Sequence, residues 1–440
     1  MNLHRTILSA LAAVSLTALS AGSAAAQTEI QWWHAMGGQL GEVLNGVAAD
    51  FNASQKDYKV VPTFKGTYPE TMTAGIAAFR AKQGPDIIQV FEVGTATMMA
   101  AKGAVYPVYQ VMADAGEKFD PKIFLPPIAG YYSTTDGKLL SMPFNSSNPV
   151  FYWNKEAFKK AGLDPEKPPK TWPEVGAAAK KIVAAGYACG FTSEWQTWIQ
   201  LENFSAWHNQ PIGTLENGLG GLGAELKLNG PAQVKHITQL LEWTKDKTFV
   251  FGGREGKPNQ LFTSGQCGML MGSSGTAGAV DASLKDPYGI GMLPFYPDVI
   301  ADPQNTIIGG ATLWVLRGRP KEDYKGVAKF FTYLSKPDVQ AKWHQATGYV
   351  PATTAAYELS KKEGFYEKKP GRDVAAQELL HKAPTANSKG LRFGNMLQIR
   401  DVEDEELEAV WAGTKTPKQA LDSIVTRGNK ILRDFQAANK

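Results

Sequence analysis

The chain has 440 residues, and its 46 basic and 42 acidic side chains leave a net charge of +4. This near balance excludes nucleic acid or an anionic membrane as the main partner, so any anion site must be local. With 43% hydrophobic residues the chain can bury two sizeable cores, and its 11 Trp and 15 Tyr favour polar organic ligands.

The N-terminus has the pattern of a secretory signal peptide. Arg5 precedes an apolar run over residues 7–19, and small residues lead to Ala26, where we expect cleavage. Loss of Arg5 leaves 45 basic and 42 acidic side chains, a net charge of +3. The alternative, a membrane anchor, is disfavoured because Ser and Thr break a short apolar core. No Cys stands at the cleavage point, so we expect an exported soluble protein without a lipid anchor.

Strands and helices alternate in the first part of the mature chain. The pattern predicts strands over residues 30–33, 58–64 and 86–91, with amphipathic helices between them. This order favours a parallel sheet covered by helices on both faces, with ligands at the carboxyl ends of the strands. Those ends carry His34, Tyr68 and Glu92. The alternative is that all three are ordinary loop residues.

Residues 139–172 form the stretch around which the chain is organised. A polar cluster over residues 145–148 precedes the strand-forming run 150–153, and Asn154 is placed to cap a helix. We expect an extended segment with a polar notch that meets a small polar ligand. A surface turn between two strands is the competing interpretation.

The next segment carries a tryptophan pair and a glycine-rich motif. A helix is expected over 172–185 and a strand over 188–192, followed by Trp195 and Trp198, three residues apart on one helix face. This pair is either a stacking platform or core packing. Residues 218–223 match G-x-G-x-x-G, but no strand precedes them, so we interpret them as a loop and not as a dinucleotide site.

Two further glycine-containing segments follow. A buried strand over 267–271 leads to a turn over 272–275, whose N–H groups at a helix start can meet an anion or can be an ordinary Ser cap. Gly309 and Gly310 interrupt an apolar run, which indicates a bend or a close approach of the backbone to ligand. Cys189 and Cys267 lie on or beside expected strands, so they form either a disulfide or two buried thiols.

Near the C-terminus, Arg392 and Arg400 precede an acidic run over 401–408 that we interpret as a solvated helix face. Thr416 and Pro417 begin the last helix. The sequence has no H-E-x-x-H, G-x-S-x-G or P-loop pattern, which favours a binding protein without cofactor or metal over an enzyme. The rival is a secreted carbohydrate-active enzyme, because counting carboxylates does not exclude a glycosidase pair.

The chain resembles a known family along nearly its whole mature length. The segments that carry the resemblance include WHAMGGQLGEVLN, YKVVPTFKGTYPE, TAGIAAFRA, QVFEVGTATMMA, LLSMPFNSSNPVFYWNKEAFKKAGLDPEKPPKTW, WIQLENFSAW, PQNTIIGGATLWV, KWHQATGYVP and LRFGNMLQIR. They are similar to the periplasmic sn-glycerol-3-phosphate-binding proteins of ABC importers, the UgpB type of the extracellular solute-binding family.

The resemblance implies a two-lobed α/β periplasmic binding protein fold of type II, each lobe a mainly parallel sheet flanked by helices. Lobe I is expected to comprise 27–146 and 310–370, and lobe II 147–309 and 371–440. The lobes close at a hinge on sn-glycerol 3-phosphate or a glycerophosphodiester such as glycerophosphocholine. The implied protein is a periplasmic monomer that delivers ligand to a membrane permease driven by a cytoplasmic ATPase.

Carried over by motif, the implied ligand contacts are Tyr68, Glu92, Ser147, Trp195, Trp198, Ser273, Gly310, Tyr349 and Arg400. In this interpretation Arg400 offers a planar fork to phosphate. Phe64 and Thr197 depart from the family pattern and alter the expected cleft wall. A milder alternative is a sugar-binding protein of the same fold, in which Arg400 has no phosphate to meet.

Overall fold

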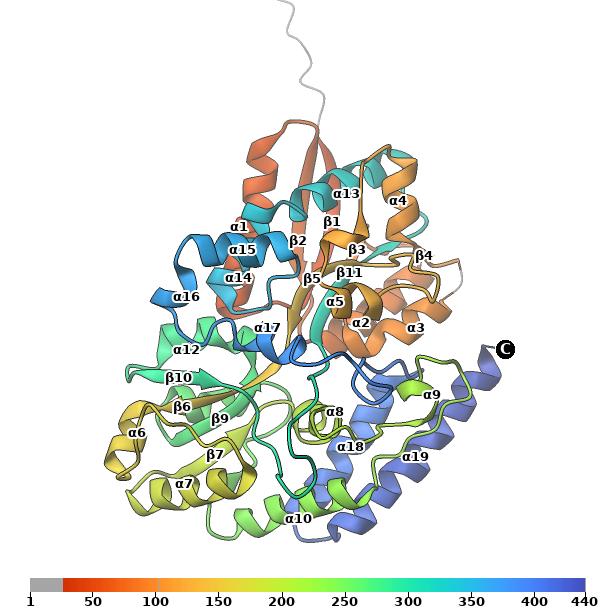
Figure 1. Cartoon of the computed structure of the whole chain (residues 1–440). Coiled ribbons are helices and arrows are strands. Elements are labelled where there is room, and N and C mark those ends of the chain that lie inside the picture. Colours follow the sequence, from red (N-terminus) through yellow and green to blue (C-terminus); the bar gives the residue numbers. More distant parts are fainter. Residues whose placement is uncertain (1–26, 102, 440) are drawn as a thin grey trace, which may run out of the picture.

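The computed structural model describes residues 27–101 and 103–439, and it contains two sheets that are each flanked by helices (Figure 1). The expected signal peptide, residues 1–26, lies outside the described residues. The six-stranded first sheet has the order β2-β1-β3-β11-β4, with β5 paired to β11. Its strands are β1 (Thr28–His34), β2 (Tyr58–Phe64), β3 (Ile87–Phe91), β4 (Val105–Tyr106), β5 (Met142–Ser147) and β11 (Gly309–Leu316).

The second sheet is five-stranded, in the order β10-β6-β9-β7-β8. Its strands are β6 (Pro149–Asn154), β7 (Cys189–Ser193), β8 (Phe249–Val250), β9 (Cys267–Ser273) and β10 (Tyr288–Gly291). We call the first sheet with its helices lobe I, and the second sheet with its helices lobe II.

The helices divide between the lobes. Those of lobe I are α1 (Gly38–Ser54), α2 (Tyr68–Arg80), η1 (Glu92–Gly94), α3 (Thr95–Ala100), α4 (Val108–Asp114), η2 (Pro121–Ile123), α5 (Pro126–Tyr131), α13 (Lys321–Leu334), α14 (Pro337–Thr347), α15 (Thr354–Lys362) and α16 (Phe365–Lys368). Those of lobe II are α6 (Lys155–Lys160), α7 (Trp172–Ala184), η3 (Trp198–Asn203), α8 (Phe204–Trp207), α9 (Thr214–Asn217), α10 (Pro231–Thr244), α11 (Asn259–Thr263), η4 (Ser274–Thr276), α12 (Ala277–Ser283), α17 (Val374–Leu379), α18 (Met396–Trp411) and α19 (Pro417–Ala438).

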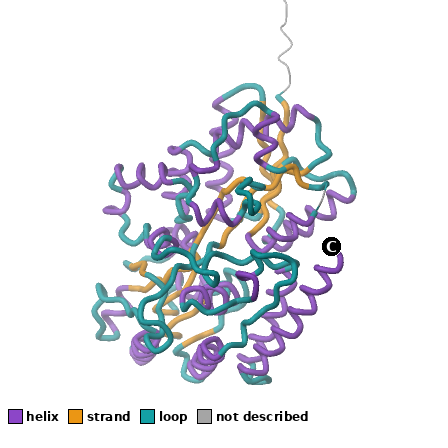
Figure 2. The backbone as a smooth tube through the Cα atoms, turned by 45° about the vertical axis from the view of Figure 1, so that its right-hand side comes forward, coloured by secondary structure: helices purple, strands orange, loops and turns teal. Residues whose placement is uncertain are grey.

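The chain passes between the lobes in three places. Only Asn148 separates β5 from β6, residues 292–308 join β10 to β11, and residues 369–373 join α16 to α17. In Figure 2 the strands form two groups, one in each half of the molecule. Ser147 pairs with Gly309 in the first sheet, whereas the expected lobe boundaries place both residues in lobe II. The boundaries expected after residues 146 and 309 thus each differ by one residue from the ends of these strands, whereas the one expected after residue 370 lies within the third passage.

Both sheets mix parallel and antiparallel pairs and are not mainly parallel. β1 is parallel to β2 and β3, and β7 is parallel to β8 and β9, as the alternating elements predict. β11 runs antiparallel to β3, and β6 runs antiparallel to β9. These two strands enter their sheets from a passage between the lobes, so no helix crossover sets their direction.

Helix starts follow the local sequence. Thr171 and Glu174 form a capping box at α7, and Thr416 and Gln419 form one at α19, each with Pro in the first turn. The Asn154 side chain accepts a hydrogen bond from Ala157 N–H at the start of α6. Within residues 27–101 and 103–439, no helix combines the length and apolar character that a membrane span requires.

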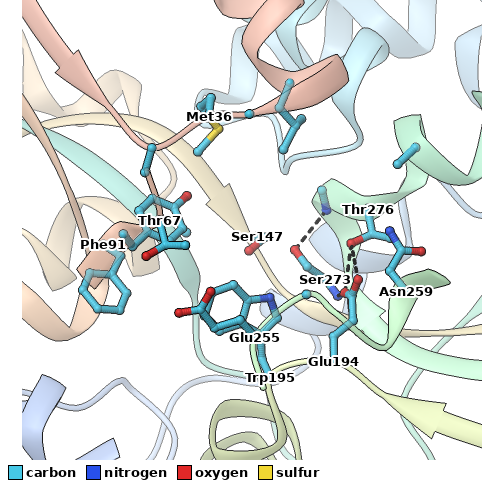
Figure 3. A pocket seen from close by; sticks show the side chains of 18 of the residues that line it. Met36, Thr67, Phe91, Ser147, Glu194, Trp195, Glu255, Asn259, Ser273 and Thr276 are labelled. Atoms are coloured by element: carbon cyan, nitrogen blue, oxygen red, sulfur yellow. Dashed lines mark hydrogen bonds between the residues drawn. The ribbon is translucent and has the colours of Figure 1, made fainter. Parts of the chain in front are cut away.

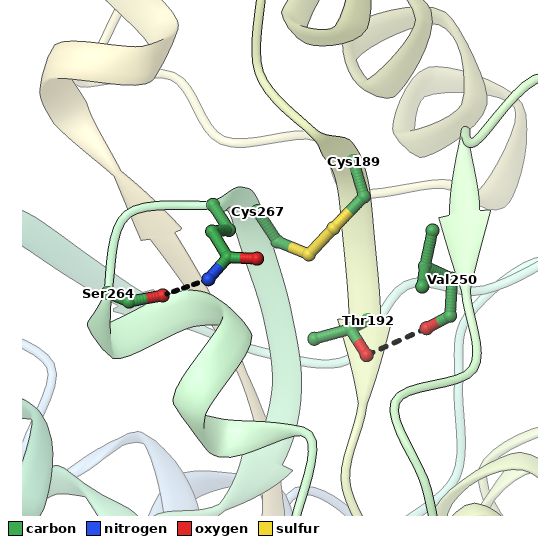
Figure 4. Close-up of a disulfide and its surroundings, with 6 residues drawn as sticks. Cys189, Thr192, Val250, Ser264 and Cys267 are labelled. Carbon is green, nitrogen blue, oxygen red and sulfur yellow. Dashed lines mark hydrogen bonds between the residues drawn. A yellow bond between two sulfur atoms is a disulfide. The ribbon is translucent and has the colours of Figure 1, made fainter.

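A disulfide joins Cys189 of β7 to Cys267 of β9 (Figure 4). The two residues are direct partners in the parallel pairing of these strands, with Cα atoms 4.6 Å apart. The bond closes a loop between residues 78 positions apart. Constraint of the unfolded chain over a loop of this length contributes about 4 kcal/mol in the chain-entropy model.

We predict that protein prepared from the periplasm contains no titratable thiol in denaturant without reductant. Replacing both cysteines by alanine should lower the melting temperature, because the unfolded chain gains freedom. Adding reductant should destabilise the wild type and leave the double variant unchanged. Two free thiols in the periplasmic protein would contradict the bond.

Candidate functional site

A cavity of about 390 Å³ lies between the lobes and is lined by residues of both. Met36, Thr67 and Phe91 approach it from lobe I, while Glu194, Trp195 and Thr276 approach it from lobe II (Figure 3). All nine residues that the sequence analysis selects as ligand contacts line this cavity: Tyr68, Glu92, Ser147, Trp195, Trp198, Ser273, Gly310, Tyr349 and Arg400. The fold therefore brings the whole predicted set together around one cavity.

On the lobe I wall, a chain of side-chain hydrogen bonds fixes Tyr68. Its hydroxyl accepts from Asn145 Nδ2 at 2.8 Å, and Asn145 Oδ1 accepts from Gln89 Nε2 at 2.8 Å. Gln89 in turn accepts from the Ala35 N–H at 2.8 Å. The Tyr68 ring stacks on Phe91 with 4° between their planes. A ring fixed this way presents its hydroxyl with little loss of freedom on binding.

The tryptophans of lobe II do not share a helix face as the spacing predicts. Trp195 lies before η3 and has a left-handed backbone conformation (φ 42°). Its backbone N–H donates to the backbone carbonyl oxygen of Glu255 at 2.8 Å. Trp198 begins η3, a π-helix, and its indole Nε1 is buried without a partner in the described part of the chain. Strained backbone and π-helices concentrate at functional sites, and here they turn both rings to the cavity.

Two glycines let backbone or side chains approach closely. Gly310 has φ +90°, and a Cβ there would lie 1.9 Å from Asn145 O. A Cβ at Gly275 would lie 2.6 Å from the ring of Tyr349, a residue of lobe I. At Gly310 the close approach is to the neighbouring strand β5, and the expected approach of its backbone to ligand stays a prediction.

Arg400 is buried at the base of the cavity and is held by two carboxylates. Its Nε and Nη2 donate to the two oxygens of Glu202 at 2.7 and 2.6 Å, and Nη2 lies 2.8 Å from Glu92 Oε1. The fork that we expected to grip a phosphate is therefore occupied by Glu202. Arg400 is only 7% exposed, so it does not form a surface ion pair with the acidic run that follows it.

Burial controls the ionisation of this cluster. Burial raises the pKa of Glu92, and Arg400 opposes the shift. Burial disfavours the charge of Arg400, but Glu202 and Glu92 outweigh it and raise the Arg400 pKa. The acidic run after Arg400 is not a fully solvated face, because Glu403 and Glu406 are buried. The two residues are three positions apart, so they lie on the same inward face of α18. A run of acidic residues in the sequence does not by itself show which of its members are buried.

The turn after β9, which we expected to meet an anionic ligand, binds a carboxyl group of the protein, that of Glu194. Glu194 accepts from Ser273 N–H at 2.9 Å and from the Thr276 hydroxyl (Figure 3). Burial raises the Glu194 pKa to about 7, against these hydrogen bonds. The sequence analysis did not select three acidic residues at or beside the cavity: Glu194, Glu202 and Glu255. A signal existed for Glu202, because it is the only charged residue in the tryptophan-flanked segment WIQLENFSAW, and a charge in such a segment indicates a buried partner.

Some predicted features lie away from the cavity. His34 is buried behind it, with Nδ1 3.3 Å from Met36 N, and does not line it. Residues 218–223 form turns without a preceding strand, in agreement with a loop. Among the described residues, no group of His, Cys, Asp and Glu has the arrangement of a metal site.

These features define a class: a two-lobed α/β protein whose cavity lies between lobes joined by three passages. The family model described as "Bacterial extracellular solute-binding protein" matches residues 46–373. The chain belongs to this family, whose members bind solutes and are not enzymes, so the prediction of a binding protein is confirmed.

Named relatives narrow the comparison. The chain is 54% identical over 428 residues to the sn-glycerol-3-phosphate-binding periplasmic protein UgpB of Yersinia pseudotuberculosis, covering 97% of each chain. It is 52% identical over 435 residues to the protein of that name from Pectobacterium atrosepticum, covering 99% of this chain and 98% of that protein. UgpB from Mycobacterium tuberculosis, solved in complex with glycerophosphocholine, matches with a TM-score of 0.78 at 18% identity, covering 93% and 100%. The fold class and the family resemblance are thereby confirmed.

We predict that Glu202→Gln lowers the free energy of unfolding by about 3 kcal/mol, because it removes one charge of a buried pair. Chemical denaturation measures this change. Glu405→Gln on α18, the helix that carries Arg400, is the control, since Glu405 pairs with Arg427 at the surface and its loss should change stability little. Equal effects of the two substitutions would refute the buried pairing.

Proposed function

We propose that this protein is the solute-binding component of an ABC importer and that it captures sn-glycerol 3-phosphate or glycerophosphodiesters such as glycerophosphocholine. The observation that carries the proposal is the cavity, which gathers hydroxyls, an arginine and two tryptophans at the nine positions that the family resemblance selects. Relatives that are 52% and 54% identical over nearly the whole chain are glycerol-3-phosphate-binding proteins, and they supply the ligand class.

The arrangement of charges favours one orientation of the ligand. Arg400 is committed to Glu202 and Glu92, so this end of the cavity is suited to glycerol hydroxyls, which donate to Glu92 and accept from arginine. The phosphate is then placed at the hydroxyls of Ser147, Ser273 and Tyr349. The hydroxyls are neutral donors, and the Glu194 carboxylate beside Ser273 is engaged by the Ser273 N–H and the Thr276 hydroxyl.

The two tryptophans complete the pocket. Trp195 covers the carbon backbone of the ligand, and the unpartnered Trp198 N–H donates to a ligand oxygen. Phe64 is 55% exposed and lies beside Gly37 at the rim of the cavity, which it does not line. Phenylalanine at this position therefore affects the binding of ligands with bulky headgroups only. Thr197 is buried between the tryptophans.

Delivery of the ligand completes the proposed role. The protein works in the periplasm as a monomer after its signal peptide is removed, and it hands the ligand to the transmembrane permease subunits of an importer with a cytoplasmic ATPase. Ligand contacts from both lobes favour the closed form over the open form. No cofactor or metal takes part.

Calorimetric titration of ligand-free protein tests the ligand class. We expect saturable binding of sn-glycerol 3-phosphate and of glycerophosphocholine at one ligand per protein, and no binding of maltose. Mass spectrometry of the mixtures afterwards should show both ligands unchanged, because the protein is not an enzyme. Binding of maltose alone would overturn the proposal in favour of a sugar-binding protein.

Trp198→Phe provides a sharper test of the site. It keeps an aromatic ring and removes the indole N–H, so affinity should fall about fivefold, or about 1 kcal/mol, with little change in melting temperature. Trp207→Phe is the matched control: Trp207 Nε1 donates to Leu293 O at 3.1 Å, away from the cavity. That variant should lose stability and keep affinity, and the reverse pattern would contradict the role of Trp198.

A further inference from the structure

Glu403 is a buried acid that the proposed binding contacts do not use. It lies one turn beyond Arg400 on α18 and is 0% exposed. Neither of its carboxyl oxygens has a hydrogen-bond partner within the described residues. An isolated carboxylate in such surroundings is strongly disfavoured, so the neutral acid is the form that the fold accommodates.

The charged groups around Glu403 also favour its neutral form. Glu202 on η3 acts on it from the adjoining helix, and Arg400 and Asp404 act from α18 itself. Burial raises its pKa well above the ordinary value, Glu202 adds to the shift, and Arg400 opposes it.

Groups on the other neighbouring elements have their own partners. On η1, Glu92 pairs with Arg400. On α10, His236 contacts Gln200 and does not reach Glu403. On α19, Arg427 is engaged by Glu405 and Glu406.

The charge balance at the cavity floor depends on this acid. Three carboxyl groups, those of Glu92, Glu202 and Glu403, surround the single guanidinium of Arg400. If all ionised, the cluster would carry a charge of about −2 in a buried setting, next to the space where an anionic ligand must bind. With Glu403 neutral, Arg400 offsets one of the two remaining carboxylates.

We propose that Glu403 determines the charge that the site accepts: as a neutral acid behind Arg400 it admits ligands with a net negative charge, and its ionisation weakens their binding. This inference rests on the proposed function. Because an anionic ligand favours the protonated form, affinity is highest where Glu403 is neutral and falls as rising pH ionises it. A ligand without net charge, such as glycerophosphocholine, should depend less on this acid.

Glycerophosphoglycerol is the probe, because its phosphodiester carries one negative charge and does not titrate near neutral pH. We expect wild-type affinity for it to fall about fivefold or more as the pH is raised from neutrality until Glu403 ionises, as for a typical coupling between two sites. Glu403→Gln should match the wild type at the lower pH and lose this decline. Glu194, with a pKa of about 7, adds a separate step near neutrality that the variant should keep.

The control is Glu405→Gln, which should follow the wild-type profile because Glu405 lies on the exposed side of α18. Calorimetry of the wild type in two buffers of different ionisation enthalpy gives a second measurement that does not depend on folding of the variant. It should show proton uptake with glycerophosphoglycerol at the higher pH and less with glycerophosphocholine. A decline that persists in Glu403→Gln, or a wild type without decline or proton uptake, would overturn the inference. Absence of binding of every glycerophosphodiester would instead refute the proposed function.

Discussion

The ion cluster around Arg400 is the constraint on which the rest of the site depends. It draws one group from each of three elements: Glu92 follows β3 in lobe I, Glu202 lies on the π-helix η3, and Arg400 lies on α18. The guanidinium therefore joins the two lobes at the base of the cavity. Because its fork is filled by Glu202, the binding mode proposed above places the phosphate at hydroxyl groups and not at the guanidinium.

A buried cluster of this kind contributes more to orientation than to stability. Removing charges from water is costly, and well-packed apolar residues often replace such pairs without loss. The pair fixes the orientation of Glu92, because one of its carboxyl oxygens contacts Arg400. The position of Glu92 relative to Tyr68 and Ser147 is therefore set before a ligand binds. A preorganised floor lowers the entropic cost of binding a small, flexible polyol.

The sequence was sufficient for much of the fold and for the members of the site, but not for their geometry. Periodicity and caps predict β2, α7 and α19 because these depend on neighbouring residues alone. Motif matching selected residues that line one cavity. The π-helix at Trp198 and the left-handed Trp195 arise from tertiary contacts that local propensity does not encode. Likewise, whether Arg400 meets a ligand or Glu202 depends on residues 198 positions apart.

The placement of β11 has a consequence for the order of folding. This strand lies between β3 and β4 and also pairs with β5, yet it follows all the strands of the second sheet in the chain. Lobe II can thus complete its sheet from residues 149–291, while the sheet of lobe I stays divided until residue 316 is available. The sheet of lobe I, which contains the first strands of the chain, is therefore the later of the two sheets to be completed. A nascent chain consequently keeps the sheet of lobe I incomplete until residue 316 has been made, after every strand of the second sheet.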